Sequence, residues 1–129
     1  MNDFALAWVT ALRSGKYEQG TGQLRDGNDA YCCLGVACEL FRQMYGKGEW
    51  EWQKTDEKDF PVYAFVVDIE HLVGVLPAAV RDALGFADSE GSYYDDGDNP
   101  KSLVNLNDAG MSFAEIASII ESEPRWLFA

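Results

Sequence analysis

Residues 102–121 read SLVNLNDAGMSFAEIASIIE and carry the clearest structural signal in the chain. Ser112 and Glu115 form the S-x-x-E pattern of a helix capping box, in which the serine side chain accepts a backbone N–H three residues further on. Apolar residues then recur at helical spacing, namely Phe113, Ile116, Ala117 and Ile120. The pattern predicts a helix that begins after Ser112 and is joined at Gly110 to a second helix before it.

Two helices joined in this way look superficially like a helix-turn-helix, but their charge argues against DNA binding. The second helix carries Glu115 and Glu121 and has no cation before Arg125. The whole chain has a formal net charge of −12, and most of this excess lies in residues 65–129. Because binding to a nucleic-acid backbone requires clustered cations, direct contact with DNA or RNA is not expected. A packed helical hairpin is the favoured interpretation.

The segments before this hairpin alternate between helical and extended patterns. Helical spacing of apolar residues predicts helices over 3–13, 33–44 and 77–84, the first capped by Asp3 and ended at Gly15. Strand patterns predict two short strands around the turn at 25–28, and further strands at 49–54 and 60–67. The polar stretches TDEKD at 55–59 and ADSEGSYYDDGDNP at 87–100 are expected to be loops.

Taken together, these segments predict an α+β fold, because helices and strands are mixed without regular βαβ alternation. The chain of 129 residues, 47% hydrophobic and 25% charged, is expected to form a single compact domain over residues 1–129. We expect a small, mainly antiparallel sheet with four or five helices. No apolar stretch approaches the ~20 residues of a membrane span, and no secretory signal is visible, so a cytoplasmic location is expected.

The three cysteines are expected to be free thiols, because they are odd in number and two are adjacent. Cys32 or Cys33 at a helix N-terminus is a possible nucleophile, with His71 as its base. Apolar neighbours instead favour buried, unreactive thiols at Cys33 and Cys38. The CC-x4-C spacing does not suit zinc, and DDGDN at 95–99 lacks the register of a calcium loop. No metal, cofactor or catalytic residue is therefore predicted.

Residues 13–25, RSGKYEQGTGQLR, form a basic, glycine-rich segment in this acidic chain. Glycines let the backbone approach a ligand closely, and arginine can bind phosphate or carboxylate through two hydrogen bonds. The alternative is that the glycines serve turns and the cations neutralise nearby acids. The candidate ligand-binding residues are Arg13, Lys16, Tyr17, Gln19, Gly20, Gly22, Gln23 and Arg25.

With these residues identified, the chain resembles a family of small, mostly uncharacterised bacteriophage proteins. The resemblance lies in WVTALRSGKYEQGTGQLRDGNDAYCCLGVACEL at 8–40, in LPAAVRDALGF at 76–86 and in LVNLNDAGMSFAEIASIIE at 103–121. It implies a phage-type accessory protein that acts in the cytoplasm of a host bacterium. It implies no activity and no site residues.

The leading functional expectation is a non-catalytic phage-type accessory protein that binds or sequesters a small anionic, nucleotide-like ligand and thereby counters host defence. One alternative is an acidic interaction protein, or nucleic-acid mimic, that inhibits a basic host protein. A second alternative is a cysteine-dependent enzyme that uses Cys32 or Cys33. None of the three involves a membrane.

Overall fold

Five helices and two antiparallel sheets make up the part of the chain that the computed structural model describes, residues 1–55 and 58–129. The helices are α1 (Asp3–Arg13), α2 (Cys33–Tyr45), α3 (Ala78–Leu84), α4 (Leu103–Asp108) and α5 (Phe113–Glu121). The strands are β1 (Arg25–Asp26), β2 (Glu49–Thr55), β3 (Lys58–Val67), β4 (Glu70–Leu72), β5 (Ser92–Tyr94) and β6 (Pro100–Ser102). The predicted α+β class with small antiparallel sheets is confirmed.

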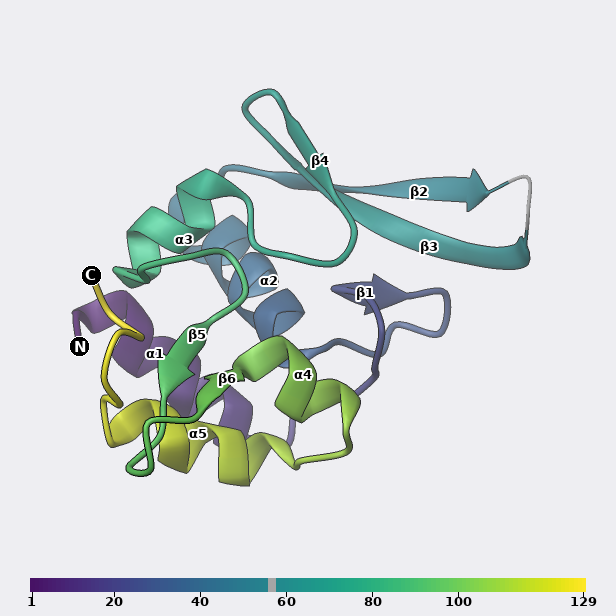
Figure 1. The fold of residues 1–129 in the computed structure, drawn as a ribbon. Helices are drawn as coiled ribbons and strands as arrows, with labels where there is room; N and C mark the ends of the chain where they lie inside the picture. The colour runs from purple at the N-terminus through teal and green to yellow at the C-terminus, as the bar shows by residue number, and fades with distance from the viewer. Residues whose placement is uncertain (56–57) are drawn as a thin grey trace.

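The helices form the body of the molecule, and the long hairpin of β2 and β3 extends beyond it (Figure 1). β3 is the centre of the larger sheet, because β1, β2 and β4 all pair with it. The two chain ends lie on the same side of the helical body. No described helix has the length and apolar character needed to cross a membrane.

One hydrophobic core joins the helices to the larger sheet. Trp8 of α1 and Phe65 of β3 are its largest fully buried side chains, and Leu24 joins them from the segment before β1. The indole N–H of Trp8 donates to the carbonyl oxygen of Cys33 at 2.9 Å, so its one polar atom is satisfied. α1 therefore contacts the start of α2 directly.

The helix starts follow local capping chemistry. The Ser112 side chain accepts the backbone N–H of Glu115 at 3.2 Å, which confirms the predicted start of α5. The cap of α1 is Asn2 rather than Asp3, because the Asn2 side chain accepts from the backbone N–H of Ala5 at 2.8 Å. Asp3 lies in the first turn, where its carboxylate is favoured by the helix dipole.

Two predicted loops contain strands. In the stretch 55–59, Thr55 ends β2 and β3 begins at Lys58, while 56–57 lie outside the described residues. The expected loop at 87–100 holds β5 and the start of β6. The Asp95 side chain accepts the backbone N–H groups of Gly97 and Asn99 at 2.9 Å each, which closes the tight turn between them.

The predicted turn at 25–28 is present, but its strands differ from expectation. The backbone N–H of Asp26 donates to the carbonyl of Ala30, as in a hairpin. The first arm is β1, which pairs with Val62 and Tyr63 of β3. The second arm is reduced to isolated bridges at Tyr31. β1 is therefore an edge strand of the larger sheet.

A candidate ligand-binding hollow between α2 and the sheet

The basic segment 13–25 connects α1 to β1, and the structure distributes its residues over separate places. The Arg13 side chain lies against α5, where it donates to the Ser118 hydroxyl at 3.0 Å and pairs with Glu121. Lys16 is exposed just beyond the end of α1. The ring of Tyr17 packs edge-on against that of Tyr31, with 5.5 Å between centroids.

The middle of the segment is used inside the protein. The Gln19 side-chain amide donates to the Asn107 side chain at 2.9 Å and to the Met111 carbonyl at 2.7 Å. The carbonyl of Gly20 accepts from Asn107 at 2.8 Å, and the N–H of Gly22 donates to Asp108 at 2.9 Å. Gln23 is half-buried nearby. These contacts dock the segment on α4 and the start of α5, so the donors of Gln19 and Gly22 are already occupied.

Arg25 lies elsewhere, in a hollow of about 580 Å³ between the C-terminal half of α2 and the start of β2. We call this the Arg25 hollow. It is lined by Arg25, Tyr31, Glu39, Arg42, Gly46, Gly48, Glu49 and Trp50. Of the eight candidate residues in the segment 13–25, Arg25 is the one in this lining.

Three aromatic rings hold the Arg25 guanidinium in place. Its central carbon lies 4.0 Å from the ring centroid of Tyr63, 5.5 Å from that of Trp50 and 5.6 Å from that of Tyr31. Asp29 accepts from its Nε at 3.1 Å and from its Nη2 at 2.7 Å through a single oxygen. The other terminal nitrogen, Nη1, makes no hydrogen bond to a described residue. The guanidinium is thus pre-positioned, and the described part of the chain leaves its Nη1 donors unused.

A second arginine faces the hollow from α2. Arg42 donates to both carboxylate oxygens of Glu39, from Nε at 2.7 Å and from Nη2 at 3.0 Å. The side chain of Glu39 is only 7% exposed, and it also accepts from the Trp50 indole at 3.4 Å. Hydrogen bonding to Glu39 raises the pKa of Arg42, which stays charged. Because Glu39 and Glu49 balance Arg25 and Arg42, the lining is close to neutral.

Close packing around two glycines sets the shape of this region. A Cβ at Gly48 would lie 2.3 Å from the ring of Phe65, and the residue has φ of +88°, so a side chain is excluded there. A Cβ at Gly35 would lie 1.8 Å from the carbonyl oxygen of Leu24. The first turn of α2 therefore packs directly on the segment that leads into β1.

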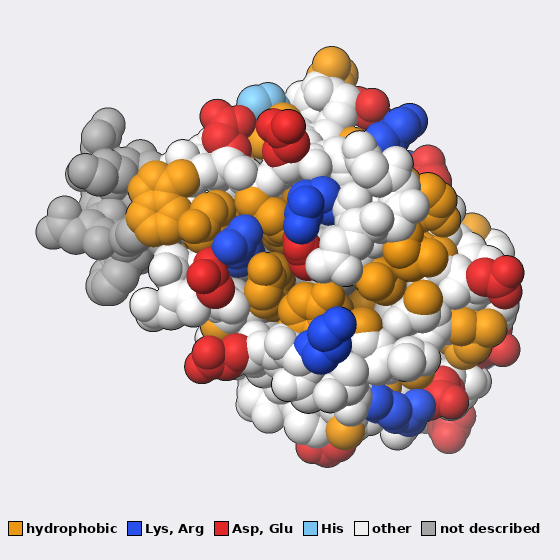
Figure 2. Space-filling view, turned by 180° about the vertical axis from the view of Figure 1, so that it is seen from behind, with side chains coloured by type: hydrophobic (Ala, Val, Ile, Leu, Met, Phe, Trp, Pro, Cys, Tyr) orange, Lys and Arg blue, Asp and Glu red, His pale blue; other side chains and the backbone are white. Residues whose placement is uncertain are grey.

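The face of the molecule seen in Figure 2 has the same mixed character. Lys and Arg side chains lie close to Asp and Glu side chains, and hydrophobic side chains surround them. No large area of uniform positive charge is visible on this face. Binding of an anion here would depend on local hydrogen bonds rather than on a broad attractive field.

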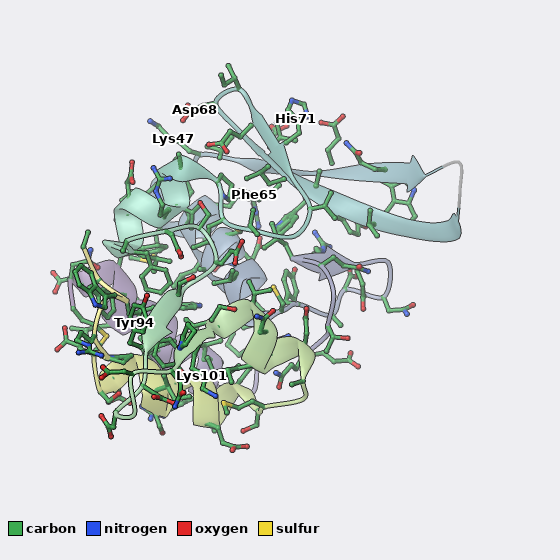
Figure 3. The ribbon with its side chains drawn as sticks, viewed as in Figure 1. Lys47, Phe65, Asp68, His71, Tyr94 and Lys101 are labelled. Atoms are coloured by element: carbon green, nitrogen blue, oxygen red, sulfur yellow. The ribbon has the colours of Figure 1, made fainter. Side chains whose placement is uncertain are left out.

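All three cysteines are buried, as predicted for Cys33 and Cys38. Burial raises the pKa of the Cys32 thiol to about 11, and it raises those of Cys33 and Cys38 well above the ordinary value. His71 lies on β4, at the edge of the larger sheet (Figure 3), with its ring 3.9 Å from Glu51. This burial disfavours the thiolate form that a cysteine nucleophile requires, because the buried thiols stay protonated near neutral pH.

Glu39, Arg42, Trp50 and Tyr63 were not among the predicted site residues. The sequence contains one local signal, the i,i+3 spacing of Glu39 and Arg42, which brings two such side chains together on a helix. Trp50 and Tyr63 reach Arg25 through strand pairing, which local patterns do not reveal. Among the described residues, no group of three or more His, Cys, Asp or Glu side chains is placed to hold a metal ion.

The chain is thus a small α+β domain with a mixed aromatic and charged hollow where the helical body meets the sheet. It belongs to the family described as Domain of unknown function (DUF8296), whose family model matches residues 2–124. No curated protein and no solved structure matches the chain.

Proposed function

We propose that this protein is a non-catalytic binding protein that takes a small, singly phosphorylated, nucleotide-like ligand in the Arg25 hollow. The observation that carries the proposal is the arrangement of Arg25, whose guanidinium lies against three rings while its Nη1 makes no hydrogen bond to the residues that the structure describes. A pre-positioned arginine loses little freedom when it binds phosphate, so each hydrogen bond contributes more. Trp50 and Tyr31 offer aromatic surface to a base.

The near-neutral lining supports a ligand with one phosphate. Arg25 and Arg42 supply two positive charges, but Glu39 and Glu49 supply two negative ones. The chain around them has a formal net charge of −12. A triphosphate would bring several negative charges next to two carboxylates, whereas a monophosphate can use the free edges of the two guanidinium groups with less repulsion.

In a phage-infected bacterium, such a protein would act in the host cytoplasm and remove a host-made nucleotide from solution. This part of the proposal rests on the sequence resemblance alone. The binding part rests on the geometry of the hollow, and the two are tested separately.

The test of the binding part is calorimetric titration with AMP, ATP, adenosine and inorganic phosphate. AMP should bind most tightly, because it combines the ring and a single phosphate. Arg25→Lys and Arg42→Gln should each weaken AMP binding about tenfold or more, since a charge-assisted hydrogen bond contributes ~1.5–3 kcal/mol. Arg81→Gln is the matched control, because Arg81 pairs with Asp82 on α3 and does not line the hollow.

The proposal fails if AMP binds no more tightly than adenosine, or if Arg81→Gln weakens binding as much as Arg42→Gln. Circular dichroism of each variant guards against a trivial loss of fold. The role in infection is tested by mass spectrometry of small molecules that co-purify with the protein from infected cells. A nucleotide monophosphate present with the parent and absent with Arg42→Gln is the expected result.

A further inference from the structure

A second surface, separate from the Arg25 hollow, lies where the β5–β6 hairpin meets the last residues of the chain. It contains a groove of about 570 Å³ whose lining includes Tyr94, Pro100, Lys101 and Trp126. We call it the Trp126 groove. Figure 3 shows Tyr94 and Lys101 at the neighbouring strands β5 and β6, away from the β2–β3 hairpin.

The backbone on both sides fixes the position of Trp126. The N–H of Tyr94 donates to the carbonyl of Arg125 at 2.9 Å, and the N–H of Ala87 donates to the carbonyl of Leu127 at 3.0 Å. Leu127 is fully buried, yet Trp126 between these two anchors is 66% exposed. A large indole is therefore presented to solvent at a defined place instead of being carried on a free chain end.

An acidic hollow adjoins the groove on the other side of Tyr94. It has a volume of about 570 Å³, and Asp95, Asp96, Asp98 and Glu123 are among its lining residues. Tyr93 and Tyr94 are in the lining of both hollows, so the two are neighbours at β5. Hydrogen bonds from the backbone of Asn99 and Gly97 lower the pKa of Asp95, which keeps this side chain ionised near neutral pH.

The protein's own Arg125 shows how this surface can bind a cation. Its guanidinium pairs with Asp98 and lies 5.7 Å from the ring centroid of Tyr94. A cation that stacks on a tyrosine and pairs with an aspartate is the arrangement expected for an arginine or lysine of a partner. Of the four carboxylates in the lining, Asp98 pairs with Arg125 and Glu123 pairs with the N-terminal ammonium of Met1 at 2.7 Å. Asp95 and Asp96 supply the remaining negative charge, which a cation of a partner would meet.

We propose that the Trp126 groove and the adjoining acidic hollow together bind a basic segment of a partner protein, in which Arg or Lys alternates with apolar side chains. Charge complementarity selects this occupant. The acidic hollow takes the cations, and Trp126 and Tyr94 take the apolar side chains. A nucleic acid would be repelled by the same carboxylates. The inference is independent of the function proposed for the Arg25 hollow.

The test is fluorescence anisotropy with a labelled ten-residue peptide of alternating Arg and Leu, at low salt. Trp126→Gly removes the indole and suits the backbone, since Trp126 has φ of +76°. The pair Asp96→Asn and Asp98→Asn removes two charges without changing side-chain size. We expect each of these variants to weaken peptide binding about fivefold to tenfold. A third variant with Glu18→Gln and Asp82→Asn makes the same charge change away from the groove and should alter binding less than twofold.

Three results would overturn the inference. The first is an equal loss in the Glu18 and Asp82 control, which would mean general attraction to an acidic protein. The second is unchanged binding by Trp126→Gly or by the Asp96 and Asp98 variant. The third is a parent protein that dimerises in sedimentation and becomes monomeric with Trp126→Gly, because the groove would then be covered by a second copy of the chain.

Discussion

Replacing Asn107 with alanine tests whether the residues from Gln19 to Gly22 serve the fold. Asn107 is fully buried on α4. Its side-chain oxygen accepts from the Gln19 amide at 2.9 Å and from the backbone N–H of Cys33 at 3.1 Å, and its amide donates to the Gly20 carbonyl at 2.8 Å. One side chain thus connects α4 to the basic segment and to the first residue of α2.

The expected cost follows from the groups that lose their partner. The Gln19 side chain keeps its hydrogen bonds with Met111 and Phe113, so the loss of its bond to Asn107 costs little stability. The N–H of Cys33 and the carbonyl of Gly20 lose the bonds that Asn107 provides, and a buried polar group without a partner costs ~1–3 kcal/mol. We expect Asn107→Ala to lower the free energy of unfolding by about 3–4 kcal/mol, a large part of the ~5–15 kcal/mol typical of a domain.

Urea unfolding followed by circular dichroism at pH 7 measures this change as a lower midpoint with an unchanged slope. Asn105→Ala is the matched control, because Asn105 lies on the same helix but is exposed. It should stay within about 0.5 kcal/mol of the parent. A loss below 1 kcal/mol for Asn107→Ala, or one no larger than that of Asn105→Ala, would refute the structural role given to Gln19 and Gly20.

Three further changes probe other parts of the fold. Ser112→Ala should cost ~1 kcal/mol by removing the cap of α5, and an unchanged urea midpoint would contradict it. Gly48→Ala should lower the free energy of unfolding clearly more than Gly46→Ala does. Both residues have positive φ, but only at Gly48 would the added Cβ meet the ring of Phe65. Equal urea midpoints for the two variants would exclude this clash. Burial raises the pKa of the Cys32 thiol from 9.0 to about 11. The stabilising contribution of the protonated thiol to the free energy of unfolding is therefore complete below pH 9 and is lost between pH 9 and about 11. As the pH rises through this window, the free energy of unfolding of the parent should fall by up to about 3 kcal/mol more than that of Cys32→Ser. Urea unfolding at several pH values measures this difference.

Local patterns predicted the helices well because their signals are local. Ser112 with Glu115 marked the start of α5, and Gly46 and Gly85 lie at the ends of α2 and α3 as expected. The hairpin of β5 and β6 was missed because its strands have three residues each, too few for an alternating pattern to be recognised. The sequence does contain a signal for the turn between them. Asp95 is followed at short range by Gly97 and Asn99, a pattern typical of an aspartate-initiated turn.

The candidate site could be predicted only in part, because it is assembled from distant segments. Arg25 was identified as a candidate, but nothing in the spacing of residues 13–25 indicates that Arg13 turns towards α5 while Arg25 turns towards β3. Trp50 and Tyr63 join Arg25 only when β2 and β1 have paired with β3. Register between strands far apart in sequence is a tertiary property, so local periodicity does not reveal it.

The two proposed binding surfaces should respond differently to salt, which allows both to be tested on one protein. The Arg25 hollow is nearly neutral within a chain of formal net charge −12, so a phosphate approaches against a weak long-range repulsion. Raising the salt shortens the Debye length from ~10 Å at 0.1 M to ~3 Å at 1 M and screens that repulsion, while the short hydrogen bonds to Arg25 and Arg42 are screened much less. AMP binding should therefore stay constant or strengthen slightly with salt. The surface around Asp96 and Asp98 attracts a basic peptide, so peptide binding should weaken steadily over the same range. If AMP binding weakens with salt as steeply as peptide binding does, the phosphate is held by general charge and the role assigned to the pre-positioned Arg25 is wrong.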